Sequence, residues 1–502
     1  MPTQTKLQQY ILLPTRGLRS TTPFVSETTK RFFAEKSVMR GGPSRSAGGD
    51  RSSARWHEID SIGEDGAKLV EMSPDSLSAL RADQPGLKIV PVVYFRPAVA
   101  PRFVIESRPK ASAGKTAVKI KLKIVSKKDG RPVAGAMVVA FIDFFNRLGA
   151  QGLTNSKGEV SLTLGGASRK LERIYIYPGK NFWSAFKKNL TITSGTQLAL
   201  EPVDLVFTDA LRYFHGSSSD QTGDGVKIAV IDTGIDTKHP DLKVAGGANT
   251  VVGENESDFG DNGLHHGTHV AGIIAARGKP PLGLRGLAPA ITLQSYRVFG
   301  KNRGEASNFA IIKAIDRAVA DGCDLINMSL GGGRPDEATM AAIEDARSQG
   351  SAVIVAAGND ERSSVSFPAS YSLALAISAL GRKGTFPQGT TEAGDVAAPY
   401  GKDKKNFIAA FSNIGPEIDL TGPGVGILST VPGGYTPMSG TSMACPAVTG
   451  LAARLLSKRT DLLKMERRQT RSEAIVQAIL QAARLLGFGS RYEGQGILNE
   501  IG

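Results

Sequence analysis

Four short stretches of the sequence carry side chains that hydrolysis of an amide bond requires. Such a reaction needs a nucleophile, a general base, a group that orients the base, and donors for the charge that develops on oxygen. The candidates are Asp232 in "AVIDTGID", the three histidines of "HHGTHVAGIIAA", Asn359 in "VAAGNDE" and Ser442 in "MSGTSMACP". Together they offer one side chain for each of the four roles.

Each of these side chains has a more ordinary interpretation when it is taken alone. Ser442 stands at the start of an apolar helical pattern with Pro446 in its first turn, where a serine often caps the helix. Asp232 and Asn359 are equally typical of turns. The spacing of the histidines also occurs in metal sites and on surfaces, although no cysteine lies nearby. The argument for catalysis therefore rests on the combination.

Alternating strand and helix patterns indicate how the chain positions these side chains. Residues 226–234 form an apolar run typical of a buried strand, and residues 308–322 have the periodicity of an amphipathic helix that ends at a glycine. The alternation continues through "DLINMSLGG", "DEATMAAIEDARSQG" and "SAVIVAAGN". It predicts an α/β fold with a doubly wound, mostly parallel sheet. Asp232, Ser329 and Asn359 follow strands, and the carboxyl ends of strands are where such sheets form sites.

The motifs taken together resemble those of the subtilases, the subtilisin-like serine proteases. "VIDTGID", "HGTHVAGIIAA", "INMSLGG", "VAAGN", "FPASY" and "MSGTSMACP" occur in that family's order over roughly residues 205–500. The resemblance implies that Asp232 orients the imidazole of His266, the first histidine of "HGTH". It also implies that Ser442 attacks the substrate and that Asn359 binds the oxyanion. The chain order Asp, His, Ser is already established for subtilisin.

The resemblance further implies a cleft that binds the main chain of a polypeptide by strand addition. The residues expected to pair with the substrate are Ser329, Leu330 and Gly331, together with the loop around Gly304 and Glu305. The pocket for the side chain before the cut bond is expected to be lined by Ala356, Ala357 and Gly358.

Several positions leave alternatives open. Asp360 and Glu361 follow Asn359 and either favour basic substrate residues or are solvated turn acids. Asp241 is present in "HPDLK", but a lysine and two prolines in the loop "RGKPPLGLRG" make a structural calcium ion doubtful, so no metal ligand and no certain cofactor is expected. Residues 382–408 are interpreted as a surface loop.

The front of the chain divides into segments of different composition. Residues 1–55 end in a Gly/Ser/Arg run and are predicted to be flexible. Residues 56–108 resemble a subtilase propeptide, a small α+β domain, with an unrelated α/β module as the alternative. Residues 115–200 alternate apolar and polar residues and predict an all-β sandwich, weakly similar to the carboxypeptidase-regulatory type. The peptidase domain is then expected over 205–502, with about residues 95–110 lying in its cleft.

Composition and charge limit the remaining function classes. The chain has 502 residues and a formal net charge of +14, and residues 101–200 hold 18 Lys and Arg against 5 Asp and Glu. No aromatic residues interleave with these lysines in a known nucleic-acid motif, so nucleic-acid binding is disfavoured. No run of 18 apolar residues predicts a membrane span. Cys323 and Cys445 are expected to be reduced, buried thiols, with a single disulfide as the alternative.

The sequence therefore predicts a serine endopeptidase that works through an Asp-His-Ser triad and an acyl-enzyme intermediate. Its N-terminal region is expected to act in cis as an inhibitor and folding aid. The expected partners are a polypeptide substrate and that N-terminal region, and the protein is expected to be a monomer. No signal peptide is visible, which favours the cytoplasm, with leaderless export open. The competing hypotheses are a non-catalytic protein that docks a partner through the basic segment and a nucleic-acid-associated factor.

Overall fold

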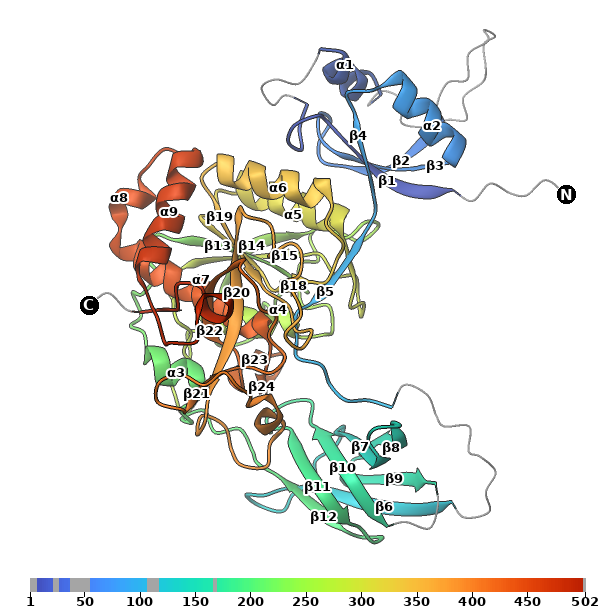
Figure 1. Ribbon diagram of the computed structural model, residues 1–502, viewed down its shortest axis with the longest axis vertical. Helices are drawn as coiled ribbons and strands as arrows, with labels where there is room; N and C mark the ends of the chain where they lie inside the picture. The colour runs from blue at the N-terminus through green and yellow to red at the C-terminus, as the bar shows by residue number, and fades with distance from the viewer. Residues whose placement is uncertain (1–6, 21–26, 37–54, 106–116, 166–168, 500–502) are drawn as a thin grey trace, which may run out of the picture.

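The computed structural model describes residues 7–20, 27–36, 55–105, 117–165 and 169–499. Three units lie in a row along the long axis of the molecule (Figure 1). We call them the N-terminal unit (residues 7–97), the β module (residues 118–200) and the C-terminal domain (residues 205–499). Within the described ranges, none of the helices is both long and apolar enough to cross a lipid bilayer.

The C-terminal domain is built on one ten-stranded, mostly parallel sheet. The strand order is β14-β15-β13-β17-β19-β20-β22-β26-β25, and β21 pairs with β20. The strands of the domain are β13 (Lys227–Asp232), β14 (Val244–Asn249), β15 (Thr292–Arg297), β16 (Ala306–Ser307), β17 (Leu325–Met328), β18 (Leu330–Gly331), β19 (Ala352–Ala356), β20 (Ala374–Arg382), β21 (Asn406–Ile408), β22 (Ile418–Pro423), β23 (Ile427–Val431), β24 (Gly434–Met438), β25 (Ala483–Arg484) and β26 (Ile497–Leu498).

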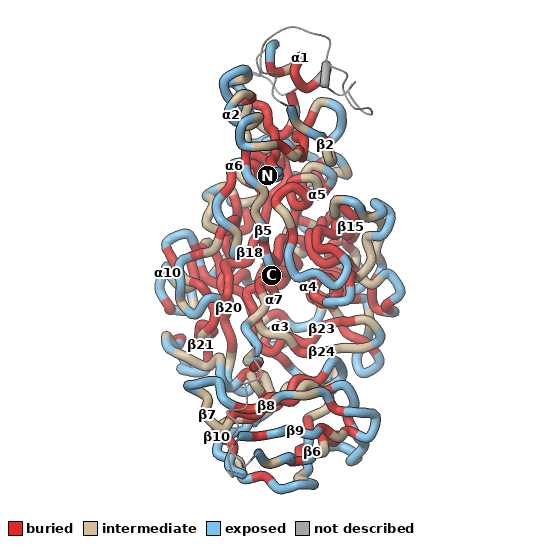
Figure 2. Tube along the Cα trace, turned by 90° about the vertical axis from the view of Figure 1, so that its right-hand side faces the viewer, coloured by how far each residue is buried: buried red, intermediate tan, exposed pale blue. Residues whose placement is uncertain are grey.

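Helices cover both faces of this sheet, as the alternating sequence pattern predicts. They are α3 (Ala210–His215), α4 (His266–Ala275), α5 (Asn308–Ala320), α6 (Glu337–Ser348), α7 (Thr441–Lys458), α8 (Thr460–Leu463), α9 (Gln469–Gln481) and α10 (Ser490–Glu493), with the short 3-10 helix η2 (Thr391–Asp395). Successive residues of a strand point to opposite faces. Ile228 and Val230 of β13 accordingly pack in the core with α4 and α7, while Ala229 and Ile231 pack in the core with α5 and α6. Figure 2 shows the buried residues concentrated in this domain.

The N-terminal unit contains β1 (Gln8–Leu13), α1 (Glu27–Lys36), β2 (Trp56–Ser61), β3 (Lys68–Met72), α2 (Pro74–Asp83) and β4 (Lys88–Pro91), and β5 (Tyr94–Pro97) leaves it. Ser73 caps α2, because its side chain accepts a hydrogen bond from the Ser76 amide at 3.2 Å. The four strands lie in the order β2-β3-β1-β4.

The prediction that residues 1–55 are flexible is wrong for the two described parts of that segment. β1 is a central strand that pairs antiparallel with both β3 and β4, and residues 27–36 form a helix. The apolar residues of "YILL" are buried by elements that come later in the chain, α1 and α2 on one face and α5 and α6 on the other, so the composition of this segment alone does not reveal the burial. The Gly/Ser/Arg run that motivated the prediction, residues 37–54, lies outside the described residues.

The N-terminal unit packs on the C-terminal domain through one face of its sheet. Ile11 and Leu13 of β1 share an apolar cluster with α5 and α6, whereas Tyr10 and Leu12 face α1 and α2. Ion pairs surround the contact, among them Arg19–Asp316 at 2.8 Å, Lys313–Asp60 at 2.8 Å and Lys88–Glu337 at 3.0 Å. The sheet is therefore apolar on both faces, and each face is covered by a different pair of helices.

The β module has seven strands in two sheets, β11-β10-β7-β8 and β12-β6-β9. The strands are β6 (Val118–Ser126), β7 (Met137–Asp143), β8 (Leu148–Leu153), β9 (Glu159–Leu164), β10 (Lys170–Tyr177), β11 (Ala185–Thr191) and β12 (Gln197–Leu200). Residues from both sheets form one separate apolar core. A second, aromatic cluster lies on the outer side of the four-stranded sheet and includes Ile105 of the segment that follows β5.

Candidate active site

Asp232 and His266 meet where β13 ends and α4 begins. His266 Nδ1 lies 2.7 Å from Asp232 Oδ1, and His266 and Asp232 are 3% and 0% exposed. Gly267 makes this approach possible, because a Cβ at that position would lie 2.4 Å from the Gly234 carbonyl oxygen and 3.1 Å from the Asp232 Cβ. A larger side chain after His266 would push α4 away from the carboxylate.

The hydrogen bonds of Asp232 fix the protonation of the imidazole. Asp232 Oδ1 accepts from the Thr233 amide at 2.7 Å and can only accept from His266 Nδ1, because an ionised carboxylate has no proton to give. The Nδ1 proton is thus assigned from its partner, which leaves Nε2 of a neutral imidazole as the basic atom. Among the described residues His266 Nε2 has no hydrogen-bond partner, so its lone pair is available.

The two neighbouring histidines have other environments. His265 is half-buried and pairs with Asp261 at 3.0 Å, and this hydrogen bond raises the pKa of His265. His269 is buried, with Nε2 near the Ile427 and Thr436 carbonyl oxygens, and burial lowers its pKa to about 3. Of the three histidines, the structure brings only His266 to the carboxylate of Asp232.

Ser442 is the second residue of α7, and its hydroxyl is buried at the start of the helix. The Ser442 Oγ donates to the Ser329 carbonyl oxygen at 2.9 Å. The alternative role of helix cap does not apply, because the position before the helix is Gly440 and no side chain caps α7. Ser442 therefore lies at the positive end of the helix, where backbone N–H groups point out of the first turn, an environment that stabilises negative charge.

Asn359 presents a free amide donor beside this helix start. Its Oδ1 accepts from the Thr441 amide at 2.9 Å, which fixes the side chain and leaves Nδ2 buried and without a partner in the described chain. A buried donor without a partner is costly unless something else accepts from it. The Gly358 amide donates to Thr441 Oγ1 at 3.1 Å and holds the loop against α7.

The strand β5 lies in the cleft in front of these residues. It pairs antiparallel with β18, where Leu330 is opposite Pro97 and Gly331 is opposite Arg96, and with β16 on its other side. Phe95 is fully buried, and its ring centroid is 6.1 Å from that of Phe367. The described part of the predicted segment 95–110, residues 95–105, thus starts in the cleft.

The peptide bond between Ala98 and Val99 lies at the helix start of α7. The Ala98 amide donates to the Ser329 carbonyl oxygen at 3.1 Å, and the Ser442 amide donates to the Ala98 carbonyl oxygen at 3.1 Å. The Ala100 amide donates to the Ser439 carbonyl oxygen at 2.9 Å. A Cβ at Gly440 would lie 2.7 Å from the Ala98 carbonyl oxygen, so only glycine admits the strand this closely.

The predicted substrate-binding residues differ in how they contact the segment in the cleft. Ser329, Leu330 and Gly331 all contact or pair with the segment in the cleft. The loop around Gly304 and Glu305 contacts β5 through Glu305, whose carboxylate accepts from the Arg96 side chain at 2.7 Å. The backbone ladder with β5 runs through Ala306 and Ser307, and Gly304 itself lies in an exposed turn before it.

The predicted wall of the specificity pocket is a buried segment that leads from β19 to Asn359. It consists of Ala356, Ala357 and Gly358.

A buried polar network beneath α7 escaped the sequence analysis. Asn327 in β17 donates to Ser329 Oγ at 3.0 Å and accepts from Thr449 at 3.0 Å and from the Cys445 thiol at 3.2 Å. A buried asparagine inside an apolar strand needs hydrogen-bond partners, so Asn327 in "LINM" could have predicted a polar network at this place. Cys323 and Cys445 are both free and buried, and burial raises the pKa of the Cys323 thiol to about 12.

Asp241, the residue considered for calcium, is engaged by hydrogen-bond donors. Its Oδ2 accepts from the Leu284 amide at 2.7 Å and from the Tyr435 hydroxyl at 2.8 Å. These donors occupy lone pairs that a cation would need. Over the ranges that the structure describes, no group of three or more His, Cys, Asp or Glu side chains is arranged to hold a metal ion.

Comparisons with known proteins agree with the motif order. The model of the subtilase family matches residues 223–502. Subtilisin NAT of Bacillus subtilis subsp. natto is 37% identical over 287 residues, which cover 56% of this chain and 66%, just under two thirds, of that protein. Subtilisin of Bacillus pumilus is 37% identical over 287 residues, 56% of this chain and 92% of that protein. M-protease of Shouchella clausii is 39% identical over 238 residues, 47% of this chain and 55% of that protein.

Proposed function

We propose, on the premise that this chain belongs to the subtilase family, that it is a serine endopeptidase. The observation that carries the proposal is the seating of a peptide bond of the chain itself, Ala98–Val99, at the start of α7. Its carbonyl oxygen accepts from the Ser442 amide at 3.1 Å. The buried pair Asp232 and His266, 34 residues apart in the sequence, is 2.7 Å apart in space.

The proposed reaction begins when the Ser442 hydroxyl turns from the Ser329 carbonyl oxygen to His266 Nε2. Nε2 takes the proton while Oγ bonds to the carbonyl carbon, and Asp232 stabilises the imidazolium that forms. The oxyanion accepts from the Ser442 amide and from Asn359 Nδ2, the buried donor that otherwise lacks a partner in the described chain. The C–N bond then breaks as the imidazolium protonates the leaving amine. Water, deprotonated by His266, hydrolyses the acyl-enzyme.

The N-terminal region acts in this proposal as an inhibitor in cis and as a folding aid. Two observations support it. First, β5 fills the part of the cleft that binds substrate residues before the cut bond, as a substrate would. Second, the sheet of the N-terminal unit shares an apolar cluster with α5 and α6. The same register predicts a preference for a small residue before the cut bond, as at Ala98, and an aromatic residue three positions earlier, as at Phe95. Ala356, Ala357 and Gly358 are proposed to wall the first of these pockets.

Self-processing at one bond tests the proposal. The purified wild-type chain is expected to yield a fragment whose new N-terminus is Val99, read by intact mass and N-terminal sequencing. Ser442→Ala and His266→Ala should stay uncut, and hydrolysis of a peptide carrying Tyr-Phe-Arg-Pro-Ala before the cut bond should fall by at least about 10⁴-fold. His265→Ala, next to the base but paired with Asp261, is the matched control and should still cut. A Ser442→Ala chain cut at the same bond would refute the assignment.

A further inference from the structure

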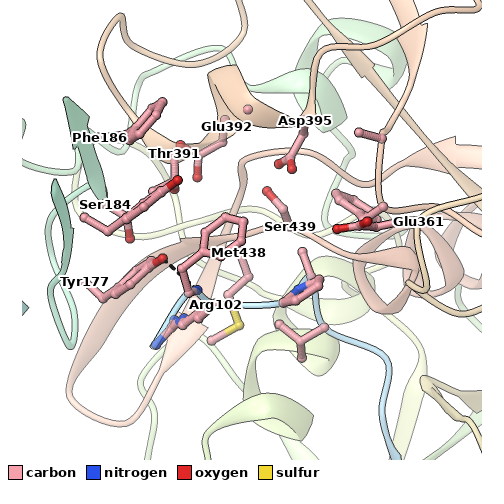
Figure 3. Close-up of a pocket in the computed structure, with 18 of the residues that line it drawn as sticks. Arg102, Tyr177, Ser184, Phe186, Glu361, Thr391, Glu392, Asp395, Met438 and Ser439 are labelled. Atoms are coloured by element: carbon pink, nitrogen blue, oxygen red, sulfur yellow. Dashed lines mark hydrogen bonds between the residues drawn. The ribbon is translucent and has the colours of Figure 1, made fainter. Parts of the chain in front are cut away.

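A cavity of about 520 Å³ lies on the far side of the Ala98–Val99 bond, between the C-terminal domain and the β module. Figure 3 shows Glu392 and Asp395 pointing into it from one side and Tyr177, Ser184 and Phe186 of the β module facing them. The segment from Val99 to Phe103 forms part of its lining. The cavity is thus placed where the chain of a substrate would continue after the cut bond.

The segment that leaves the cleft is held by the β module through specific contacts. The Phe103 amide donates to the Tyr177 hydroxyl at 3.1 Å, and the Ile105 amide donates to Gln151 Oε1 at 2.7 Å. These are main-chain contacts, which do not depend on the sequence that makes them. The β module can therefore bind the main chain of another extended polypeptide in the same way as it binds residues 99–105. We call this binding surface the track.

Side-chain recognition on this track centres on an aromatic ring. The ring centroid of Phe103 is 4.9 Å from that of Tyr175 and 5.1 Å from that of Phe144, and the Arg147 guanidinium is 5.2 Å from it. Aromatic pairs at these distances stabilise a contact beyond the area they bury, and a cation over a ring adds to this. The cluster lies outside the core of the β module, so it is not needed to close that core.

The position before Phe103 carries a positive charge that interacts with Glu392. The Arg102 guanidinium lies 5.4 Å from the Tyr177 ring centroid. Glu392 is 4% exposed, and its Oε2 has no hydrogen-bond partner in the described residues. Burial, followed by the Glu392 charge, raises the pKa of Asp395 well above its usual range. A cation at the position of Arg102 favours the charged form of the Glu392 carboxylate.

The residues that face the β module come from an insertion interpreted from sequence as a surface loop. The Phe186 amide donates to the Gly389 carbonyl oxygen at 2.9 Å, and the Thr391 amide donates to the Ser184 carbonyl oxygen at 3.1 Å. These bonds join η2, which carries Glu392 and Asp395, to β11. The insertion and the β module therefore build the two walls of the cavity together.

We propose that the β module and η2 form a substrate-recognition site for the chain that follows the cut bond. The site selects polypeptides with a basic residue at the fourth position and an aromatic residue at the fifth position after that bond, the places of Arg102 and Phe103. In the processed enzyme the resident segment 99–105 competes for the site, and a substrate displaces it. This inference rests on the proposed peptidase activity.

The test uses the self-processed enzyme and peptides that share Tyr-Phe-Arg-Pro-Ala before the cut bond. One peptide continues as Val-Ala-Pro, and a second as Val-Ala-Pro-Arg-Phe-Val-Ile. Two more replace the Phe by Ala or the Arg by citrulline, which keeps the shape and removes the charge. We expect kcat/KM to be about 10-fold higher with Phe than with Ala at the fifth position, mostly through KM, and a smaller loss with citrulline.

Variants on the two sides of the contact should move this preference in opposite directions. Tyr175→Ala should bring the ratio of the kcat/KM values of the Phe and Ala peptides to about 1. Phe103→Ala should enlarge that ratio, because the resident segment 99–105 then competes less well for the site. Phe145→Ala, which removes a 92% exposed ring next to Phe144 in the turn between β7 and β8, is the matched control and should leave the ratio unchanged.

The peptide that continues only as Val-Ala-Pro distinguishes a failure of the peptidase proposal from a failure of the recognition site. If it is not cut, the peptidase proposal fails. If it is cut but the Phe and Ala peptides are hydrolysed equally by both the wild-type enzyme and Phe103→Ala, the recognition site is refuted.

Discussion

The N-terminal unit and the β module are attached to the same domain in contrasting ways. The N-terminal unit contributes Ile11 and Leu13 to the apolar cluster of α5 and α6 and has no cover of its own, among its described residues, for that face of its sheet. The β module closes its own core and touches the C-terminal domain at a tip around Trp183 and across a cavity. A unit without a complete core depends on its partner to fold, whereas one with a complete core can move as a body.

The difference suits the two proposed tasks. A strand that fills a catalytic cleft must be held tightly, and an apolar interface does this over a large area. A surface that receives incoming chains needs groups that are pre-positioned but not fully satisfied, and Glu392 Oε2 is such a group in the described part of the chain. The predictions below are made in the Ser442→Ala background, which keeps the chain intact.

The largest effect is expected when the shared core is broken. Ile11→Asp places an unpaired carboxylate between β1 and the helices of the C-terminal domain, and we expect the free energy of unfolding to fall by more than about 4 kcal/mol. Calorimetry should show the main transition shifting as a whole, because the two units unfold together. Gln9→Asp, on the same side of β1 but exposed, should cost less than about 0.5 kcal/mol. A separate low-temperature transition for Ile11→Asp would contradict the shared core.

A smaller and different effect is expected at the tip of the β module. Trp183 is 1% exposed, and its ring lies 5.4 Å from that of Phe207. Trp183→Ala should weaken the attachment by about 3 kcal/mol. Limited proteolysis should then cut near residues 201–208 faster, while the main calorimetric transition keeps its position. An equal shift of the main transition would show that the β module, too, folds only with its neighbour.

The smallest effect concerns pH at the contact of the N-terminal unit. The Leu18 amide donates to Asp345 Oδ2 at 2.8 Å, and burial raises the pKa of Asp345 to about 6, with Glu344 and Asp316 adding to the rise and Arg19 opposing it. A carboxyl whose pKa is higher in the folded chain stabilises it below about pH 4, and this stabilisation is lost as pH rises through about 6.

Asp345→Asn should remove that dependence. We expect the stability advantage of the parent chain over the Asp345→Asn variant to shrink by about 2 kcal/mol between pH 4 and pH 7, measured by denaturant unfolding. The exposed neighbour substitution Glu344→Gln is the comparison and should reduce the slope only in part, because burial is the main cause of the raised pKa of Asp345. A difference between the two chains that does not vary with pH would contradict this account.

The sequence by itself determined the elements whose signals are local. The 3.6-residue periodicity of α5, the cap of α2 by Ser73 and the alternation in β6 all follow from neighbours within a few residues. The motif order also indicated the subtilase family and the residues Asp232, His266, Asn359 and Ser442. These motifs also contain the glycines that their close contacts require. Gly267 lets His266 approach Asp232, and Gly440 lets the segment in the cleft approach the start of α7.

Tertiary structure alone decided what depends on distant partners. β1 is a strand only because β3 and β4 flank it, the substrate ladder runs through Ala306 and Ser307 rather than Gly304, and η2 is a cavity wall only because β11 lies against it. Burial and strand pairing are properties of pairs of segments, and the free energy that fixes them comes from surfaces removed from water together. A single stretch of sequence does not contain its partner, so these features appear only once the chain has folded.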